Sequence, residues 1–147
     1  VYDVFYAYKY NYPQMKVEID YKEVSDYGHP ENFINGTESL EHGTNYYGDF
    51  YGWDDGIIKF TNEDNPDAQN ILIISNSFSN AVNKMIASDF YNTYVIDLRN
   101  YKNEVGEEFY VDSFLKENKI NKVLYIGNYY FFTNDKMLLN FYDIKDK

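Results

Sequence analysis

Three short polar segments in this sequence each follow an apolar, strand-like run, and they carry the residues best suited to chemistry. They are residues 75–80 (Ser-Asn-Ser-Phe-Ser-Asn), 97–99 (Asp-Leu-Arg) and 127–130 (Gly-Asn-Tyr-Tyr). In open parallel sheets, ligands bind beyond the carboxyl ends of the strands. We therefore expect an active site to lie where these three segments meet.

The first segment suits nucleophilic catalysis, because small hydroxylated residues stand where an apolar run passes directly into a helical pattern. A serine in such a turn lies near the N–H groups of the helix start, which can stabilise a developing oxyanion. The alternative is structural, since Ser75, Ser77 and Ser79 are residue types that turns and helix N-caps favour. Spacing alone leaves both interpretations open.

Strand-like and helix-like patterns alternate after residue 55 and must position these segments. Apolar runs predict strands at residues 56–60, 71–74, 94–97 and 123–126, and helical spacing predicts helices at 79–90, at 109–119 and after an N-cap at Thr133, the last with Met137, Leu138 and Phe141 facing inward. The runs at 71–74 and 123–126 are continuous, as in strands covered on both faces. We expect an α/β fold with a parallel sheet and helices on both faces.

The first part of the chain has a different pattern. Residues 2–10 and 15–21 alternate in polarity around an Asn-Tyr-Pro-Gln link, which predicts an antiparallel β-ribbon. Residues 22–55 are rich in Gly, Asn, Asp and Glu, and a loop of that length is usually functional or packs on another element. We expect residues 1–55 (ribbon and acidic loop) and 56–147 (α/β portion) to form one compact unit.

Composition narrows the classes of function. The chain has 147 residues and no cysteine, which excludes a disulfide scaffold, a thiolate zinc site and a cysteine nucleophile. Its aromatic content of 20% argues against disorder. The net charge of −11 argues against nucleic acid and anionic membranes as partners. Before Asn70 there are 14 acidic and 4 basic residues, so the α/β portion is nearly neutral.

Four segments of the chain resemble motifs of one hydrolase superfamily. Residues 71–80 (ILIISNSFSN) resemble the nucleophile block of SGNH (GDSL-like) hydrolases, in which a strand runs into a serine turn. Residues 47–56 (YGDFYGWDDG), 94–101 (YVIDLRNY) and 118–124 (NKINKVL) resemble segments of the DHHW family, which is related to alginate O-acetyltransferase-like cell-surface enzymes. The resemblance covers roughly residues 46–141 and implies a three-layer α/β/α, flavodoxin-like fold.

The resemblance also implies roles for individual residues. Ser77 would be the nucleophile, and its backbone N–H would help to form the oxyanion hole. Asn128 stands where SGNH enzymes have an oxyanion-donating asparagine, although the block here is Gly-Asn-Tyr rather than Gly-x-Asn-Asp. Asn76 replaces the Asp that usually supports the serine turn. The candidate substrate contacts on the same segments are Asn80, Arg99 and Tyr129.

Other polar and aromatic groups are open to two interpretations. Asp97 and Arg99 match the family pattern. They could form a structural ion pair or a binding site. Oxygen ligands at 53–55 or 64–67 could hold Ca²⁺ or Mg²⁺, but neither segment has calcium-loop spacing, so solvated turns are the simpler interpretation. Residues 35–37 fit a glycosylation sequon, and the tyrosines at 46, 47, 51, 129 and 130 could stack on sugars or simply pack. We expect no metal and no cofactor.

A serine nucleophile needs a base, normally a histidine backed by a carboxylate. The DHHW family carries its base in an Asp-His-His-Trp motif upstream of the serine, and no such motif is present in this sequence. The chain has two histidines, His29 and His42, both in the acidic loop, and neither matches the family pattern. We therefore expect this chain to be the C-terminal part of a longer protein whose N-terminal half supplies the Asp and His.

The function implied by the resemblance is that of a bacterial SGNH-like carbohydrate esterase or O-acetyltransferase that acts on a surface polysaccharide, outside the cell or at its surface. We expect little turnover from the isolated chain. The alternative is a non-catalytic carbohydrate-binding or cell-surface interaction module, which Asn76 and the missing base favour. A third possibility is a flavodoxin-like binder of a phosphorylated cofactor, which the negative charge and the lack of Gly in the 75–80 turn disfavour.

Overall fold

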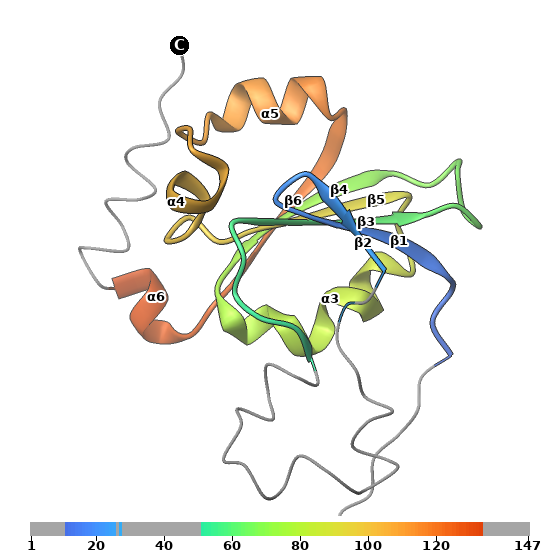
Figure 1. Ribbon diagram of the computed structural model, residues 1–147, viewed down its shortest axis with the longest axis horizontal. Helices are drawn as coiled ribbons and strands as arrows, with labels where there is room; N and C mark the ends of the chain where they lie inside the picture. Colours follow the sequence, from blue (N-terminus) through green and yellow to red (C-terminus); the bar gives the residue numbers. More distant parts are fainter. Residues whose placement is uncertain (1–10, 26, 28–50, 134–147) are drawn as a thin grey trace, which may run out of the picture.

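The computed structural model describes residues 11–25, 27 and 51–133. The elements are β1 (Met15–Ile19), β2 (Lys22–Val24), β3 (Ile57–Asn62), β4 (Asn70–Ser75), the 3₁₀ helix η1 (Ser77–Ser79), α3 (Asn80–Ala87), β5 (Asn92–Ile96), α4 (Tyr101–Val105), α5 (Val111–Glu117), β6 (Ile120–Ile126) and α6 (Tyr129–Thr133). Figure 1 shows them arranged around one central sheet.

The sheet has six strands in the order β2-β1-β3-β5-β4-β6 and is mixed. Strand β4 lies between β5 and β6 and runs parallel to both, whereas β3 is antiparallel to β5 and to β1. The expectation of a wholly parallel sheet is therefore wrong for its β3 side. The link at residues 63–69 is too short for a parallel crossover, which needs a dozen or more residues, so β4 runs opposite to β3.

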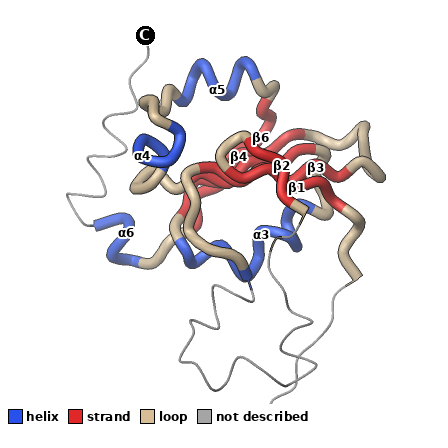
Figure 2. The backbone as a smooth tube through the Cα atoms, viewed as in Figure 1, coloured by secondary structure: helices blue, strands red, loops and turns tan. Residues whose placement is uncertain are grey.

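Helices cover both faces of the sheet (Figure 2). On one face, Ile71, Ile73 and Val95 pack with Ala87 of α3. On the other face, Leu72, Ile74 and Ile96 pack with aromatic residues from α4, α5 and the link between them, namely Tyr101, Phe109 and Phe114. Because side chains alternate along a strand, one run of β4 supplies both halves of the core. The continuous apolar pattern at residues 71–74 thus correctly predicts a strand that is covered on both faces.

The N-terminal ribbon has a different partner from the one expected. Strand β1 pairs with β2 through a tight turn at Asp20 and Tyr21, both of which have positive φ. Its other edge pairs with β3, so both edges of β1 are occupied over Val17–Ile19 by β2 and β3. Residues 2–10 themselves lie outside the described residues. Strand β2 was not predicted, because its residues Lys22 and Glu23 are charged and form no apolar run.

The helices differ from the expected ones mainly at their ends. The helix expected at 79–90 is η1 followed by α3, and the helix expected at 109–119 is α5. The short helix α4 was not predicted, because it has little apolar periodicity. Thr133 is not an N-cap, since it lies in α6 and its hydroxyl donates to the carbonyl of Tyr129. The helix expected beyond it, with Met137, Leu138 and Phe141, lies outside the described residues.

Among the described strands, β6 lies at one edge of the sheet, and it is not buried on both faces, contrary to expectation. Val123, Leu124 and Tyr125 are exposed, at 41%, 37% and 46%. An apolar run shows that a strand is suited to burial but not what covers it. Within residues 11–25, 27 and 51–133, no helix is long and apolar enough to cross a membrane.

Candidate functional site

The three predicted polar segments follow the carboxyl ends of three neighbouring parallel strands, at the same end of the sheet. Ile74 is paired with Ile96, and Ser75 with Ile126, so the parallel strands β4, β5 and β6 end together. Ser77 and Asn128 each follow one member of the Ser75–Ile126 pair by two residues. Asp97 follows Ile96, the last residue of β5, directly. The meeting of these segments therefore follows from strand register.

Asn76 shapes the serine turn. It is the N-cap of η1, and its side-chain carbonyl accepts a hydrogen bond from the backbone N–H of Phe78 at 3.2 Å. The backbone carbonyl of Asn76 accepts a second bond from the N–H of Ser79 at 3.0 Å. Asn caps a helix about as well as Asp does. The replacement of the family's Asp by Asn76 thus leaves a supported turn.

The three serines of the turn differ in their surroundings. Ser75 and Ser79 are buried, and their hydroxyl oxygens lie 2.6 Å apart in a mutual hydrogen bond. These two residues therefore stabilise the turn, as the structural interpretation expects. Ser77 is half-buried at the first position of η1, which makes it the most accessible hydroxyl of the three.

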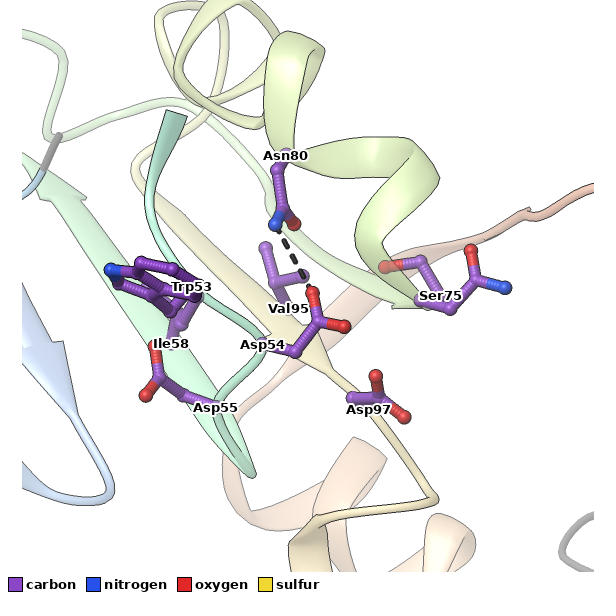
Figure 3. Close-up of a pocket in the computed structure, with 9 residues that line it drawn as sticks. Trp53, Asp54, Asp55, Ile58, Ser75, Asn80, Val95 and Asp97 are labelled. Carbon is purple, nitrogen blue, oxygen red and sulfur yellow. Dashed lines mark hydrogen bonds between the residues drawn. The ribbon is translucent and has the colours of Figure 1, made fainter. Parts of the chain in front are cut away.

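A small pocket lies beside the turn, with a volume of about 10 Å³, comparable to the space that one water needs. Its lining comes from the loop before β3, from β3, from the serine turn and the start of α3, and from the end of β5. The lining residues are Trp53, Asp54, Asp55, Ile58, Ser75, Asn76, Asn80, Val95 and Asp97. In Figure 3, Asp54 lies between Asn80 and Asp97, while Trp53 and Asp55 lie together on the other side. The pocket is polar and acidic on its walls and apolar at Ile58 and Val95.

Asp54 connects the Gly52–Asp55 loop to the sheet. The amide of Asn80, at the start of α3, donates to the carbonyl of Gly52 and to Oδ1 of Asp54, both at 3.2 Å. The amide of Asn100 donates to the Asp54 carbonyl at 3.0 Å. Asn80, a candidate substrate contact, is therefore engaged within the protein, and it is buried.

Arg99 completes this connection. Its Nη2 lies 2.9 Å from Oδ2 of Asp54 and also pairs with Asp97, to which Nε donates at 2.9 Å. The hydrogen bond to Asp97, and the charges of Asp97 and Asp54, raise the pKa of Arg99 despite its partial burial. The geometry is that of a structural ion pair, and any contact of Arg99 with substrate stays a prediction.

Asp55 has the most perturbed carboxyl group near the pocket. Burial raises its pKa to about 6, and the negative charges of Asp20, Asp54 and Glu104 add to this shift. A carboxyl with such a pKa can exchange a proton near neutral pH, which is a property of many functional sites. Among the described residues, no three His, Asp or Glu side chains are arranged to hold a metal ion.

Exposed aromatic side chains surround the strand ends. Trp53 is 53% exposed and lines the pocket, and Phe78, directly after Ser77, is 57% exposed. Tyr129, directly after Asn128, is 83% exposed at the start of α6. Asn128 itself is half-buried. An exposed aromatic residue therefore follows each of Ser77 and Asn128 directly in the chain.

The structure does not place a base. His29 and His42 lie outside the described residues, as do the 35–37 sequon and the tyrosines at 46 and 47, and the part of the chain that is described contains no histidine. The role of Asp54 could not be read from the sequence, because its partner Arg99 is 45 residues away.

No protein-family model matches this chain, and no curated protein does. Among solved structures, a DHHW family protein from Eubacterium siraeum is similar at a TM-score of 0.62 with 20% identity, over 90% of this chain and 41% of that one. Bacillus cereus PatB1 is similar at a TM-score of 0.61 in two structures. The PatB1 structure with a sulfonyl adduct is 21% identical to this chain, over 86% of this chain and 40% of PatB1. The second PatB1 structure is 22% identical, over 86% of this chain and 39% of PatB1.

This chain thus spans about two fifths of the length of the solved structures that it matches. At these identities the similarity shows a common fold. The fold is α/β, with a mixed six-stranded sheet and helices on both faces, and the strand ends that carry Ser77 and Asn128 belong to it.

Proposed function

We propose that this chain is the serine-bearing part of an SGNH-like acyl esterase or O-acyltransferase of the DHHW family, with the three-layer arrangement of that superfamily. The observation that supports the proposal is the pairing of Ser75 in β4 with Ile126 in β6, since Ser77 and Asn128 each follow one member of this pair by two residues. In the proposed reaction both side chains act on one carbonyl group, as a nucleophile and an oxyanion donor do.

In the proposed reaction, Oγ of Ser77 attacks the carbonyl carbon of an acyl ester. The Oγ–C bond forms, the hydroxyl proton passes to a base, and the carbonyl oxygen becomes an oxyanion. The Ser77 N–H and the Asn128 amide donate hydrogen bonds to that oxyanion. When the C–O bond of the ester breaks, the base returns the proton to the leaving alcohol, and water or a second alcohol then takes the acyl group.

The similarity to PatB1 supports this chemistry indirectly. That protein is known with a sulfonyl adduct, and sulfonyl groups form adducts by reaction with nucleophiles. The similar fold of this chain offers a hydroxyl at a supported turn beyond β4, an interior strand of the sheet. The proposal assigns the corresponding reactivity to Ser77.

The base is proposed to come from polypeptide outside this chain. The described residues contain no histidine, and the chain covers only 39–41% of the solved structures that it resembles. An N-terminal half of the same protein would supply an Asp-His pair, as the resemblance to the DHHW family implies. The substrate would be an O-acylated polysaccharide at or outside the cell surface, on the same grounds.

The test compares two proteins with a chromogenic acetyl ester as substrate: this chain, and the protein translated from the whole reading frame. We expect Ser77-dependent hydrolysis in the second and little in the first. The matched variants are Ser77→Ala and Ser79→Ala, since Ser79 is buried in the same turn. If this chain alone is active and loses its activity in His42→Ala, the base lies within it and the external half is unnecessary.

A second candidate function is a non-catalytic carbohydrate-binding module. The exposed rings of Trp53 and Tyr129 beside the strand ends favour it, because aromatic faces can stack on sugar rings. Glycan binding that survives Ser77→Ala, with no hydrolysis by the whole protein, would select this alternative.

A further inference from the structure

The two edges of the sheet that the described strands form differ in their protection. Strand β2, at one edge, has three residues, and two of them, Lys22 and Glu23, are charged. Strand β6, at the other edge, has seven residues and no proline, and Lys122 is its one charged side chain. Proteins usually protect an open edge with charge, proline or a short strand, because its unpaired N–H and C=O groups can pair with another chain. Strand β2 has this protection, and β6 lacks most of it.

The part of β6 that can accept a further strand is regular. Its register with β4 shifts at the first pair and then continues without interruption along Lys122–Ile126. Lys122 lies at the start of this stretch, and its Nζ is 5.6 Å from the ring centroid of Phe90, which packs against the core on one face of the sheet. The residues that follow, Val123–Ile126, form a regular apolar edge, which is the kind of edge that pairs readily with another strand.

The cover of the sheet ends at β6 on both faces. The three residues of β4 that pair with Val123, Leu124 and Tyr125 are fully buried, whereas these three residues of β6 are exposed. Because side chains alternate along a strand, Leu124 lies on one face and its two neighbours lie on the other. The element that covers β6 must therefore bring apolar side chains to both faces, as a strand with its own packed helices does.

Exposed aromatic side chains continue beyond the end of β6. Tyr129 and Tyr130 begin α6, and both are exposed. We call Val123, Leu124, Tyr125, Tyr129 and Tyr130 together the β6 surface. Large apolar side chains gathered on the surface of a soluble protein typically mark a contact with other polypeptide.

The size of the similar solved structures indicates which polypeptide covers this surface. This chain spans 39–41% of their length, so each of them holds more polypeptide than this chain does. The proposed function requires such polypeptide, an N-terminal half whose base acts beside Ser77 and Asn128. Asn128 follows the end of β6 by two residues, so one end of a strand laid along β6 lies next to it. The polypeptide that covers β6 can therefore also bring the base to the site.

We propose that β6 is the docking edge for the N-terminal half of the same protein. A strand of that half pairs with Val123–Ile126 and extends the sheet, and the apolar side chains around this strand cover the β6 surface. The identity of the docked polypeptide rests on the proposed function. The capacity of the edge to accept a strand rests on β6 itself and does not require Ser77 to react.

The test is hydrogen–deuterium exchange of the β6 amides, resolved to single residues, in this chain and in the protein translated from the whole reading frame. In a strand that is paired on one side, alternate amides face the open edge and exchange quickly. We expect these alternate amides of residues 122–126 to exchange at least about a hundredfold more slowly in the whole protein. The amides of β2 are the comparison, and their rates should change far less.

The variant Val123→Lys separates docking from folding. Because this side chain is exposed, the substitution should lower the Tm of this chain by less than about 2 °C. In the whole protein it places a charge in the proposed contact and should lower the Tm by about 5 °C or more. The matched control is Met85→Lys on α3, where the side chain is 44% exposed, and its effect should be the same in both proteins.

Four results would overturn the proposal. The first is fast exchange of the β6 edge amides in the whole protein, and the second is equal slowing of exchange in β2 and β6. The third is slow exchange already in this chain that becomes fast when residues 134–147 are removed, which would make that segment the occupant. The fourth is slow exchange in this chain only at concentrations where light scattering detects a dimer, which would make a second copy the occupant.

The same exchange measurement distinguishes failure of this proposal from failure of the proposed function. Protection of β6 in the whole protein should persist in Ser77→Ala. Protection in a whole protein that has no esterase activity would leave the docking inference standing while the catalytic proposal fails. Ser77-dependent hydrolysis by a whole protein whose β6 edge stays open would have the opposite meaning.

Discussion

Ser77 and Asn128 lie at matching positions beyond two adjacent parallel strands, because Ser75 of β4 is paired with Ile126 of β6. Beyond this pair, Ser77 begins the 3₁₀ helix η1 and Asn128 directly precedes α6. The proposed reaction requires the two side chains to act on one carbonyl group, and the pairing of Ser75 with Ile126 brings their chain segments to the same end of the sheet.

The Gly52 backbone supports the loop beside this site. Gly52 has a φ of +92°, and a Cβ there would lie 2.6 Å from Cε2 of the buried Tyr27. Gly52→Ala should therefore lower the free energy of unfolding by about 3 kcal/mol, through both strain and overpacking.

Gly106→Ala is the matched control for that substitution. Gly106 has a similar φ of +86° but nothing within 4 Å of its would-be Cβ, so its loss should be about 1 kcal/mol. Chemical denaturation of both variants measures the difference. Equal losses would show that Tyr27 moves aside without cost.

The pair of Asp54 and Arg99 should be asymmetric in its response to mutation. Asp54→Ala removes hydrogen bonds from a side chain that is 32% exposed, with an expected loss of about 1 kcal/mol. Arg99→Ala also leaves the buried carboxylate of Asp97 without its counterion, with an expected loss of about 3 kcal/mol.

A double-mutant cycle on Asp54 and Arg99 should give a coupling energy of about 0.5–1 kcal/mol. The exposed pair Lys16–Glu63 provides the comparison, with side chains 56% and 59% exposed, and its coupling should be near zero. If the two cycles agree, the loop is not held by this ion pair.

The stability of the protein should depend on pH through Asp55. Its pKa is raised from 3.8 to about 6 by burial and by neighbouring carboxylates, so the folded protein binds this proton more tightly than the unfolded chain does. The stability contributed by the protonated form is fully present below pH 3.8 and is lost as the pH rises through about 6.

Asp55→Asn should therefore stabilise the protein at pH 7.5 and have no such effect at pH 3.5. Because Asp55 is only half-buried, solvent screening reduces the expected gain to about 1 kcal/mol, or a few degrees in the midpoint of thermal unfolding. Calorimetric scans at the two pH values check this. A gain of the same size at both would assign the effect to something other than the charge.

Asn83 lies in the core with an unsatisfied amide. It is fully buried on α3, and neither its Nδ2 nor its Oδ1 has a hydrogen-bond partner among the described residues. Replacement by Leu, which has a similar volume, should raise the free energy of unfolding by about 1–2 kcal/mol. Urea denaturation measures it, and a loss of stability would mean that the amide is satisfied in solution.

The sequence was informative where a pattern is local. The continuous run Ile71–Ile74 predicts a strand covered on both faces, and the Ser and Asn residues after it predict the turn. The equally apolar run that ends at Ile126 gave no indication that β6 is an edge, since burial depends on neighbours distant in the chain. The antiparallel direction of β3 could have been inferred from the short link at residues 63–69.

The candidate site was predictable in part for the same reason. Strand ends and the serine turn follow from local patterns, and they indicate which segments meet. The ion pair of Asp54 with Arg99 joins residues 45 positions apart, and it is one of the contacts that hold the loop containing Trp53. No local sequence pattern predicts this ion pair or the position of the loop.

The most direct test of the account is covalent labelling of Ser77. The protein translated from the whole reading frame is treated with methanesulfonyl fluoride, digested, and mapped by tandem mass spectrometry, with Ser77→Ala and Ser79→Ala alongside. The account expects one sulfonyl group, on Ser77, with loss of ester hydrolysis in step with labelling and no label in Ser77→Ala. Full inactivation with the adduct on another residue, or undiminished hydrolysis by Ser77→Ala, would contradict it.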